Sequence, residues 1–401
     1  MNTTPFNDTD IQAFRKDTPG TATLIHFNNA GSSLPPDTVT RAITTYLQEE
    51  ALNGGYETEE KYREQLDNTH HLVAQLINAD PDEIALTENA SAAWDLAFYG
   101  LDLSQGDEII TTEMEYASNV LGLLNAQKTK GVIIKVIASD EKGNFPLAEL
   151  EAAITSKTRL IAVTHIPSTA GNILPVAAIG AIARKHGITY LLDACQSAGQ
   201  MPLDVKEIGC DMMAVTGRKF LRGPRGTGFL FVKKEVQPAL RLQQMDGFTV
   251  TNLTTTDFTV RNDARRFEWH EKNHAVVLGF NKAIEYALHA GVDKIWQRVQ
   301  LLSGLLRRQL NNIDGVTVQD TGEQLCGIVT FTVKDIKPVL IKKELAAKGI
   351  NVNIGPEQAT LYYMHRRRLP QVVRASVHYY NTEEEIALLC SNLNTIIQKV
   401  H

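Results

Sequence analysis

The chain has few cysteines and no recognisable metal-ligand spacing. Only four of its 401 residues are cysteine, and Cys195, Cys210, Cys326 and Cys390 fall in no CxxC or Cys/His pattern. Each lies in or beside an apolar segment, which favours buried, inert thiols. We therefore expect neither a metal site nor a disulfide framework.

The chain also lacks an excess of positive charge and any long hydrophobic run. A formal net charge of -6 gives no reason to expect nucleic acid or an anionic membrane as a partner. The start, MNTTPFNDTDIQAFRKD, has no apolar core of a secretory signal, and no apolar run approaches the length of a membrane span. The basic run HRRRL, residues 365–369, is then a solvated or anion-facing loop. We expect a cytoplasmic protein.

What the chain does have is an alternation of apolar strands and helical patterns. Strands are expected at EIAL, EIITTEM, GVIIKVI, RLIAVTHI, ITYLLDA, DMMAVTG and GTGFLFV, between about residues 80 and 235. Several are apolar without alternation, which is typical of strands covered on both faces. Helical patterns fall between them at AAWDLAFYGL, LAELEAAI and VAAIGAIARKHG. This order predicts a mostly parallel, doubly covered α/β sheet.

A second, smaller unit is expected towards the C-terminus. After about residue 270 a long helical pattern is interrupted near Gly291, and VTVQD, IVTFTV, VLIKKELAAKG and a final helix beginning at TEEEIALL follow. This order of helices and strands predicts an α+β domain. The domain should pack closely on the first one, because no low-complexity linker separates them. The expected division is an N-terminal arm at 1–22, a large domain at 23–268 and a small C-terminal domain at 269–401.

Polar residues follow several of the expected strands. Asp193 comes directly after ITYLL, Thr216 after DMMAV, Tyr116 after EIITTEME and Ser168 after RLIAVTHIP, while Lys219 lies 26 positions beyond Asp193 (219 − 193). Ligands of open α/β sheets bind beyond the carboxyl ends of the strands. We expect these five side chains to converge on one pocket.

The residue types in this group suit one cofactor. Lys219 stands between two cations, Arg218 and Arg222, whose charge would lower its pKa and make its amine nucleophilic towards an aldehyde. Pyridoxal phosphate needs such a lysine, a carboxylate for its ring nitrogen, here Asp193, and a phosphate cradle. The hydroxyl of Thr216 and the guanidinium of Arg218 are suitable phosphate donors.

A helix start adds further phosphate donors. In TENASAAWD the backbone N–H groups of Ser91 and Ala92 would lie at the positive end of a helix that follows a strand. Ser91, Ala92 and Thr216 have an ordinary alternative role as turn and cap residues.

Taken together, LLDACQSAGQ and TGRKFLRGPRGTGFLFV resemble the class V aminotransferase superfamily, the fold type I pyridoxal-phosphate enzymes that include the cysteine desulfurases. The resemblance extends from HFNNAGSSLPP to VVRASVHYYNTEEEI. It implies that Lys219 holds the cofactor as an internal aldimine and that Asp193 pairs with the pyridinium nitrogen. It also implies that Gln196 bonds the phenolic oxygen and that Tyr116 stacks on the ring. The family further implies a homodimer with active sites near the subunit interface.

The same resemblance assigns substrate contacts. Arg374, in VVRASVHYYN, would clamp the substrate carboxylate, for which its forked guanidinium is suited. Asn29 and Ser168 are grouped with it as substrate-binding residues. Tyr56, in NGGYETEEKY, either lines this pocket or packs in an interface. Arg374 as a surface ion-pair partner and Tyr116 as a half-buried loop aromatic are the alternatives to be tested.

Several departures from the desulfurase pattern narrow the reaction. Desulfurases carry a cysteine on a mobile loop before the carboxylate-binding arginine, but here Ala359 lies near that position and Cys326 begins an expected strand. Persulfide chemistry on such a cysteine is not expected. Arg218 stands where desulfurases have histidine, and Ser168 replaces their asparagine. Glu271 replaces a phosphate-binding threonine that relatives offer to the neighbouring subunit.

The motifs THIPSTAG, RFEWHEKN and VRASVHYYNTEEEI most resemble the hercynylcysteine sulfoxide lyase and isopenicillin N epimerase-like branch. The expected reaction is a β-lysis in which Lys219 removes the α proton of an S-substituted cysteine and a sulfur group leaves, giving pyruvate and ammonia. An aminotransferase or an amino-acid epimerase would use the same residues. The other class of function is a non-catalytic binding protein that keeps the fold; the presence of both Lys219 and Asp193 argues against it.

Overall fold

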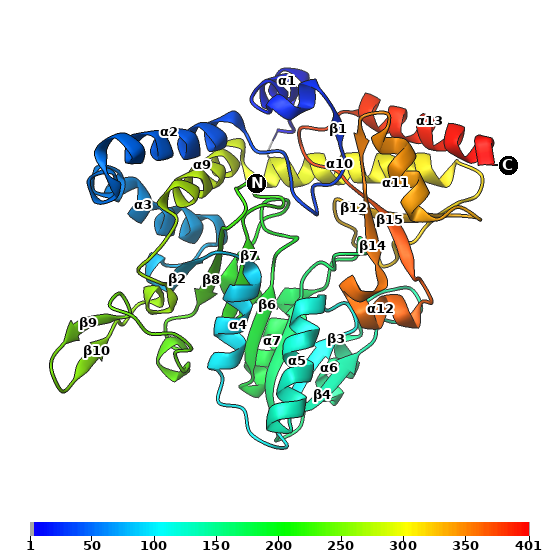
Figure 1. The fold of residues 1–401 in the computed structure, drawn as a ribbon. Coiled ribbons are helices and arrows are strands. Elements are labelled where there is room, and N and C mark those ends of the chain that lie inside the picture. Colours follow the sequence, from blue (N-terminus) through cyan, green and yellow to red (C-terminus); the bar gives the residue numbers. More distant parts are fainter. Residues whose placement is uncertain (1–3, 401) are drawn as a thin grey trace.

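The computed structural model describes residues 4–400 and contains two main sheets (Figure 1). The larger has seven strands in the order β2-β8-β7-β6-β5-β3-β4. Its strands are β2 (Ile84–Thr87), β3 (Glu108–Thr112), β4 (Ile133–Ile137), β5 (Thr158–Thr164), β6 (Thr189–Asp193), β7 (Met212–Thr216) and β8 (Gly228–Val232). Only β8 runs antiparallel to its two neighbours. All seven expected strands are present, and the expected mostly parallel sheet is confirmed.

Both faces of this sheet are covered, as the unbroken apolar strands predicted. Along β5, Ile161 and Val163 join one hydrophobic core while Leu160 and Ala162 join the other. The first core is closed by α3 (Gly55–Ile77), α6 (Leu147–Ala152), α7 (Val176–His186) and α8 (Val205–Ile208). The second is closed by α4 (Ala90–Gly100) and α5 (Ala117–Lys130). Successive strand side chains point to opposite faces, so such a strand must be apolar throughout.

The smaller sheet lies above the carboxyl end of the larger one in Figure 1 and has the order β11-β12-β15-β14. Its strands are β11 (Val316–Val318), β12 (Ile328–Val333), β14 (Asn353–Pro356) and β15 (Gln371–Ser376). The helices α10 (Val292–Asn311), α11 (Pro338–Ala346) and α13 (Glu383–Val400) pack around this sheet. Arg374 lies inside β15. A short strand, β1 (Ile25–His26), pairs with β13 (Ile350–Asn351).

Two helices near the N-terminus were missed by the sequence analysis. These are α2 (Asp37–Asn53) and α3, and both pack against α9 (His274–Ala290). The expected break between α9 and α10 falls at Gly291, whose φ of 86° ends the first helix. A hairpin of β9 (Val250–Leu253) and β10 (Phe258–Val260) projects from the body of the protein in Figure 1. The domain limits at 22 and 268 remain a prediction.

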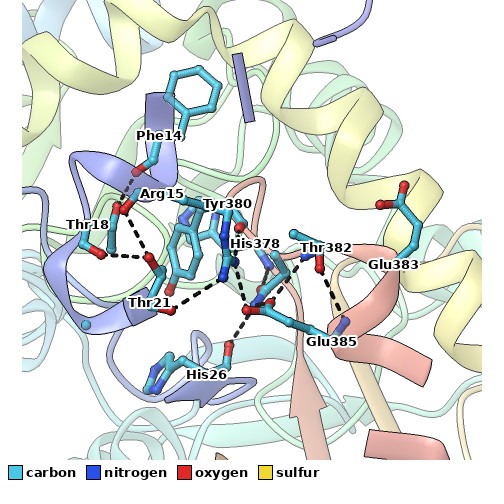
Figure 2. A network of polar contacts seen from close by, with 12 residues as sticks. Phe14, Arg15, Thr18, Thr21, His26, His378, Tyr380, Thr382, Glu383 and Glu385 are labelled. Atoms are coloured by element: carbon cyan, nitrogen blue, oxygen red, sulfur yellow. Dashed lines mark hydrogen bonds and ion pairs between the residues drawn. The ribbon is translucent and has the colours of Figure 1, made fainter. Parts of the chain in front are cut away.

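Residues 4–400 also contain five short 3-10 helical turns, one of which lies in the N-terminal arm. They are η1 (Pro19–Ala22), η2 (Pro81–Glu83), η3 (Gln237–Ala239), η4 (Ala264–Phe267) and η5 (Glu357–Thr360). Figure 2 shows how the arm, with α1 (Asp8–Lys16), is attached to the small sheet's side of the molecule. The guanidinium of Arg15 donates to Glu385 Oε1 at 2.7 Å and to the Tyr380 carbonyl at 3.0 Å. The arm therefore contacts the C-terminal part of the chain directly.

Candidate active site

Lys219 lies on the loop that connects β7 to β8 and is 8% exposed. Its Nζ stands 5.8 Å from the centroid of the Tyr116 ring. Burial lowers the pKa of Lys219, and the charges of Arg218 and Arg374 lower it further, while Asp193 opposes them. A lowered pKa makes the neutral, nucleophilic amine more available at neutral pH.

Asp193 is the last residue of β6 and is 5% exposed. Its Oδ1 accepts the backbone N–H of Cys195 at 2.9 Å, and its Oδ2 accepts the side-chain amide of Asn119 at 3.0 Å. These two donors orient the carboxylate. It is thus a fixed anion beside Lys219.

Arg218 and Arg374 bring two more cations to the same place. Burial lowers the pKa of Arg374 to about 10, with a further contribution from Arg218, so the two guanidiniums are close enough to repel each other. Arg374 is 7% exposed and its Nη1 donates to the Ser168 carbonyl at 2.8 Å. Among residues 4–400 neither guanidinium forms an ion pair with a carboxylate. Such a cluster suits an anionic ligand.

The chain segment at residues 28–31 approaches three of these side chains. Gln196 Nε2 donates to the Ala30 carbonyl at 3.1 Å, Arg218 Nη1 donates to the Gly31 carbonyl, and Arg374 Nη2 donates to Asn28 Oδ1 at 3.4 Å. The sequence analysis did not assign this role to the segment's backbone. The pairing becomes visible only in the fold, because residues 28–31 lie far from the other three in sequence.

Two buried polar atoms of the group have no partner within residues 4–400. These are Gln196 Oε1 and Arg374 Nε. Buried polar groups are almost always hydrogen-bonded, so two buried polar atoms without a partner indicate room for a polar ligand. Together with Lys219 and Asp193, these donor and acceptor atoms fit pyridoxal phosphate.

The expected phosphate donors lie at two strand ends. Thr216 ends β7 and is buried, while Ser91 lies in the first turn of α4 and is exposed. The N–H of Ala92 already donates to Asn89 Oδ1 at 2.9 Å, because Asn89 caps the helix. A phosphate at this helix start would have to share or displace that contact.

The remaining expected substrate residues differ in their surroundings. Ser168 is buried, and its hydroxyl donates to the Ala359 carbonyl at 3.2 Å. Asn29 is fully buried, donates to the Ser376 carbonyl at 2.7 Å and accepts the Tyr380 hydroxyl, so its amide is used within the chain. Tyr56 is 81% exposed on α3 and lies outside the buried group. Its role stays a prediction, with the interface alternative open.

Arg222 does not act on Lys219 as we expected. Its guanidinium turns away and stacks against three tyrosine rings, with the nearest centroid, that of Tyr380, at 4.7 Å. It donates to the Leu34 carbonyl at 2.9 Å and to Thr18 Oγ1 at 2.5 Å. Its backbone N–H donates to the Lys219 carbonyl at 2.9 Å. Arg222 therefore holds the lysine loop against the N-terminal arm, and of the two flanking arginines only Arg218 lowers the pKa of Lys219.

The segment where desulfurases carry their cysteine folds here as η5 and α12 (Leu361–Arg366). Tyr363 and Met364 are the buried residues of α12, and Arg366 forms a bidentate ion pair with Glu113 at 2.5 Å. His365 and Arg366 are thus helical, although we expected a loop. Cys326 is fully buried, and burial raises the pKa of its thiol to about 12. It is not a mobile nucleophile.

Sequence reasoning missed Glu115 and Asn119, which lie beside Tyr116. Glu115 is 1% exposed and shares the side-chain amide of Asn119 with Asp193. Their spacing of four residues could have been noticed, because a residue before a helix start and one in its first turn are neighbours. Within residues 4–400 no group of three or more His, Cys, Asp or Glu residues could hold a metal ion.

Comparison with known proteins identifies the family of the chain. The model of the class V aminotransferase family matches residues 25–389. A probable cysteine desulfurase from Methanothermobacter thermautotrophicus is 33% identical over 388 residues, covering 95% of this chain and 97% of the relative. The chain therefore belongs to the class V aminotransferase family, and the expected enzyme class and cofactor, pyridoxal phosphate, are confirmed.

Several solved structures have the same fold as this chain. The apo cysteine desulfurase from Thermococcus onnurineus NA1 superposes with a TM-score of 0.91 at 27% identity, covering 97% of this chain and 98% of that one. The cystine C–S lyase C-DES, in complex with its product cysteine persulfide, gives a TM-score of 0.86 at 26% identity, with 94% and 99% covered. The expected fold type I architecture is confirmed. No helix within residues 4–400 is long and apolar enough to cross a bilayer.

Proposed function

We propose that this protein is a carbon–sulfur β-lyase that acts on an S-substituted cysteine, with sulfoxides among the candidate substrates, and releases pyruvate and ammonia. One observation carries the proposal: three cations, the buried Lys219 and Arg374 and the half-buried Arg218, lie close together, with Asp193 beside Lys219. This charge distribution matches a cofactor phosphate and a substrate carboxylate beside a protonated ring nitrogen.

Each residue of the site has a separate role in this proposal. Arg374, whose Nε has no partner within residues 4–400, would bind the substrate carboxylate and so fix the amino acid's orientation. Thr216 and Arg218 would hold the phosphate, Asp193 the ring nitrogen and Gln196 the phenolic oxygen. When bound, pyridoxal phosphate supplies an electron sink for negative charge on the substrate's α carbon. Lys219, with its lowered pKa, would take the α proton as a general base.

The cysteines favour lysis over desulfuration. All four are buried, and none lies on the η5–α12 segment that corresponds to the desulfurase loop. A desulfurase passes sulfur to a protein thiolate, and a buried thiol whose pKa is raised is a poor acceptor. A lyase needs no such group, because the Cβ–S bond of the substrate breaks and the sulfur departs with its substituent as the leaving group. The similarity to the C–S lyase C-DES supports the same choice.

The test compares the wild type with Lys219→Ala and with Lys233→Ala, a control at an exposed lysine. Each protein is given pyridoxal phosphate, its visible absorbance is recorded, and pyruvate is assayed with S-alkylcysteines and their sulfoxides. We expect a cofactor band and pyruvate from the wild type and the control, and neither from Lys219→Ala. Alanine formed from cysteine would mean desulfuration. Conversion to the pyridoxamine form, or racemised substrate, would mean transamination or epimerisation.

We also propose that the protein is a homodimer. Leu52 and Tyr56, at the junction of α2 and α3, are 83% and 81% exposed, and Trp269 is 41% exposed. Large exposed apolar side chains of this kind are typical of interfaces. Light scattering should give twice the chain mass, and Leu52→Lys should weaken the dimer. A monomeric wild type would contradict the proposal.

A further inference from the structure

Glu115 is a buried carboxylate that the proposed chemistry does not use. It lies in the loop between β3 and α5, directly before Tyr116, the N-cap of α5. It is 1% exposed. Within residues 4–400 it forms no ion pair with a Lys, Arg or His side chain. Burying a carboxylate without a neighbouring cation costs free energy of folding, so we expect Glu115 to have a specific role.

The hydrogen bonds of Glu115 connect it to two residues that are assigned to the cofactor site. Its Oε1 accepts the N–H of Tyr116 at 3.0 Å and the amide of Asn119 at 2.7 Å. The same Asn119 nitrogen donates to Asp193 Oδ2 at 3.0 Å. One amide thus bridges two carboxylates, and one carboxylate is bonded to the residue expected to stack on the ring.

Two threonines complete the arrangement. Thr164, the last residue of β5, donates its hydroxyl to Glu115 Oε1, and Thr111 of β3 donates to Oε2 at 3.2 Å. The carboxylate is therefore held by strands β3 and β5 and by the start of α5. Groups fixed by several rigid elements position their neighbours more accurately than groups on free loops.

We propose that Glu115 is a positioning residue of the cofactor site, which fixes Asp193 through the Asn119 amide and fixes Tyr116 through its backbone N–H. This inference rests on the proposed roles of Asp193 and Tyr116. Glu115 touches neither cofactor nor substrate in this assignment. It sets the direction of the Asp193 carboxylate and adds negative potential behind it.

The charge of Glu115 also depends on pH. Burial raises its pKa to about 7, and the nearby charge of Asp193 contributes to the rise. The other titratable groups that interact with it are Tyr190 and Tyr362, whose pKa values its charge raises further beyond the effect of burial. Below pH 7 Glu115 is mostly neutral, and above it mostly ionised. Ionisation should strengthen binding of a cofactor whose ring nitrogen is positive, because the negative charge of Glu115, behind Asp193, then adds to the attraction for that nitrogen.

The experiment titrates apo-protein with pyridoxal phosphate at pH 6 and pH 8 and measures the dissociation constant by equilibrium dialysis. The variants are Asn119→Ala, which removes the bridge, and Glu115→Gln, which keeps the shape and removes the charge. Glu108→Gln is the matched control. That carboxylate lies at the other end of β3, is also buried and also accepts two threonine hydroxyls.

We expect Asn119→Ala to weaken binding roughly tenfold or more, since a hydrogen bond to a charged group is lost. Glu115→Gln should match the wild type at pH 6 and bind more weakly at pH 8, and Glu108→Gln should match it at both. Unchanged binding in Asn119→Ala and Glu115→Gln would overturn the inference while leaving the proposed function intact. An equal loss in Glu115→Gln at both pH values would mean a packing role only. A wild type that binds no cofactor would overturn the inference and the proposed function together.

Discussion

Replacing Glu268 with glutamine should remove much of the protein's stability near neutral pH. Glu268 follows η4, and its side chain is completely buried. Its Oε1 accepts His70 Nε2 at 2.7 Å and the Leu86 N–H at 2.8 Å, and its Oε2 bonds Lys272 Nζ. The carboxylate therefore joins α3, β2 and the segment before α9.

The size of the effect follows from the pKa. Burial alone would raise the pKa of Glu268, but His70 and Lys272 outweigh it and lower the pKa to about 2. An unfolded glutamate titrates near 4.3, so the difference corresponds to about 3 kcal/mol of unfolding free energy. Because the folded pKa is depressed, this contribution is fully present above about pH 4.3 and is lost as the pH falls towards 2.

Urea denaturation of Glu268→Gln and the wild type, from pH 7 down to pH 3, measures this contribution. We expect the variant to be less stable by about 3 kcal/mol or more at pH 7, because the buried His70 and the half-buried Lys272 lose their carboxylate partner. The difference should shrink at pH 3. Glu151→Gln, at an exposed pair with Lys185, should cause no resolvable change. Equal stability at pH 7, or a difference that does not depend on pH, would refute the reasoning.

Three further predictions concern packing and the η5–α12 segment. Gly180→Ala would place a Cβ 1.8 Å from a backbone carbonyl oxygen of α8 and should destabilise the protein by about 3 kcal/mol in thermal unfolding. The control Gly304→Ala meets only ordinary van der Waals contacts and should leave the stability unchanged or raise it. Leu306→Ala, at a fully buried position of α10, should cost about 2–5 kcal/mol in urea denaturation. Arg366→Ala breaks the ion pair with Glu113 and should speed hydrogen exchange in α12; unchanged exchange would show that buried Tyr363 alone holds it.

The amino-terminal half of the fold shows where sequence patterns stop being informative. The strands of the large sheet were predictable because burial on both faces requires uniformly apolar residues. Helices α2 and α3 were missed because they carry many polar residues, with only a narrow buried stripe that includes Val39, Tyr46, Val73 and Ile77. Their position depends on packing against α9, which lies about 200 residues further along the chain.

The residues of the candidate site also differ in how far the sequence predicts their positions. Lys219, Asp193, Gln196 and Arg218 lie within one stretch of 27 residues (219 − 193 + 1), so local motifs were enough to propose them. Arg222 lies just beyond that stretch, and no local motif indicates that its side chain turns towards tyrosines of the C-terminal part.

The sequence by itself determined the doubly covered sheet, the lysine and aspartate at its carboxyl edge, the cofactor that they fit and the absence of a cysteine from the segment before Arg374. These depend on residue type and local order. Only the tertiary structure decided that Glu115 shares the Asn119 amide with Asp193, that residues 28–31 reach Gln196, and that Tyr56 lies exposed. The physical reason is that hydrogen bonds and burial depend on distances in space, which residues remote in sequence acquire only on folding.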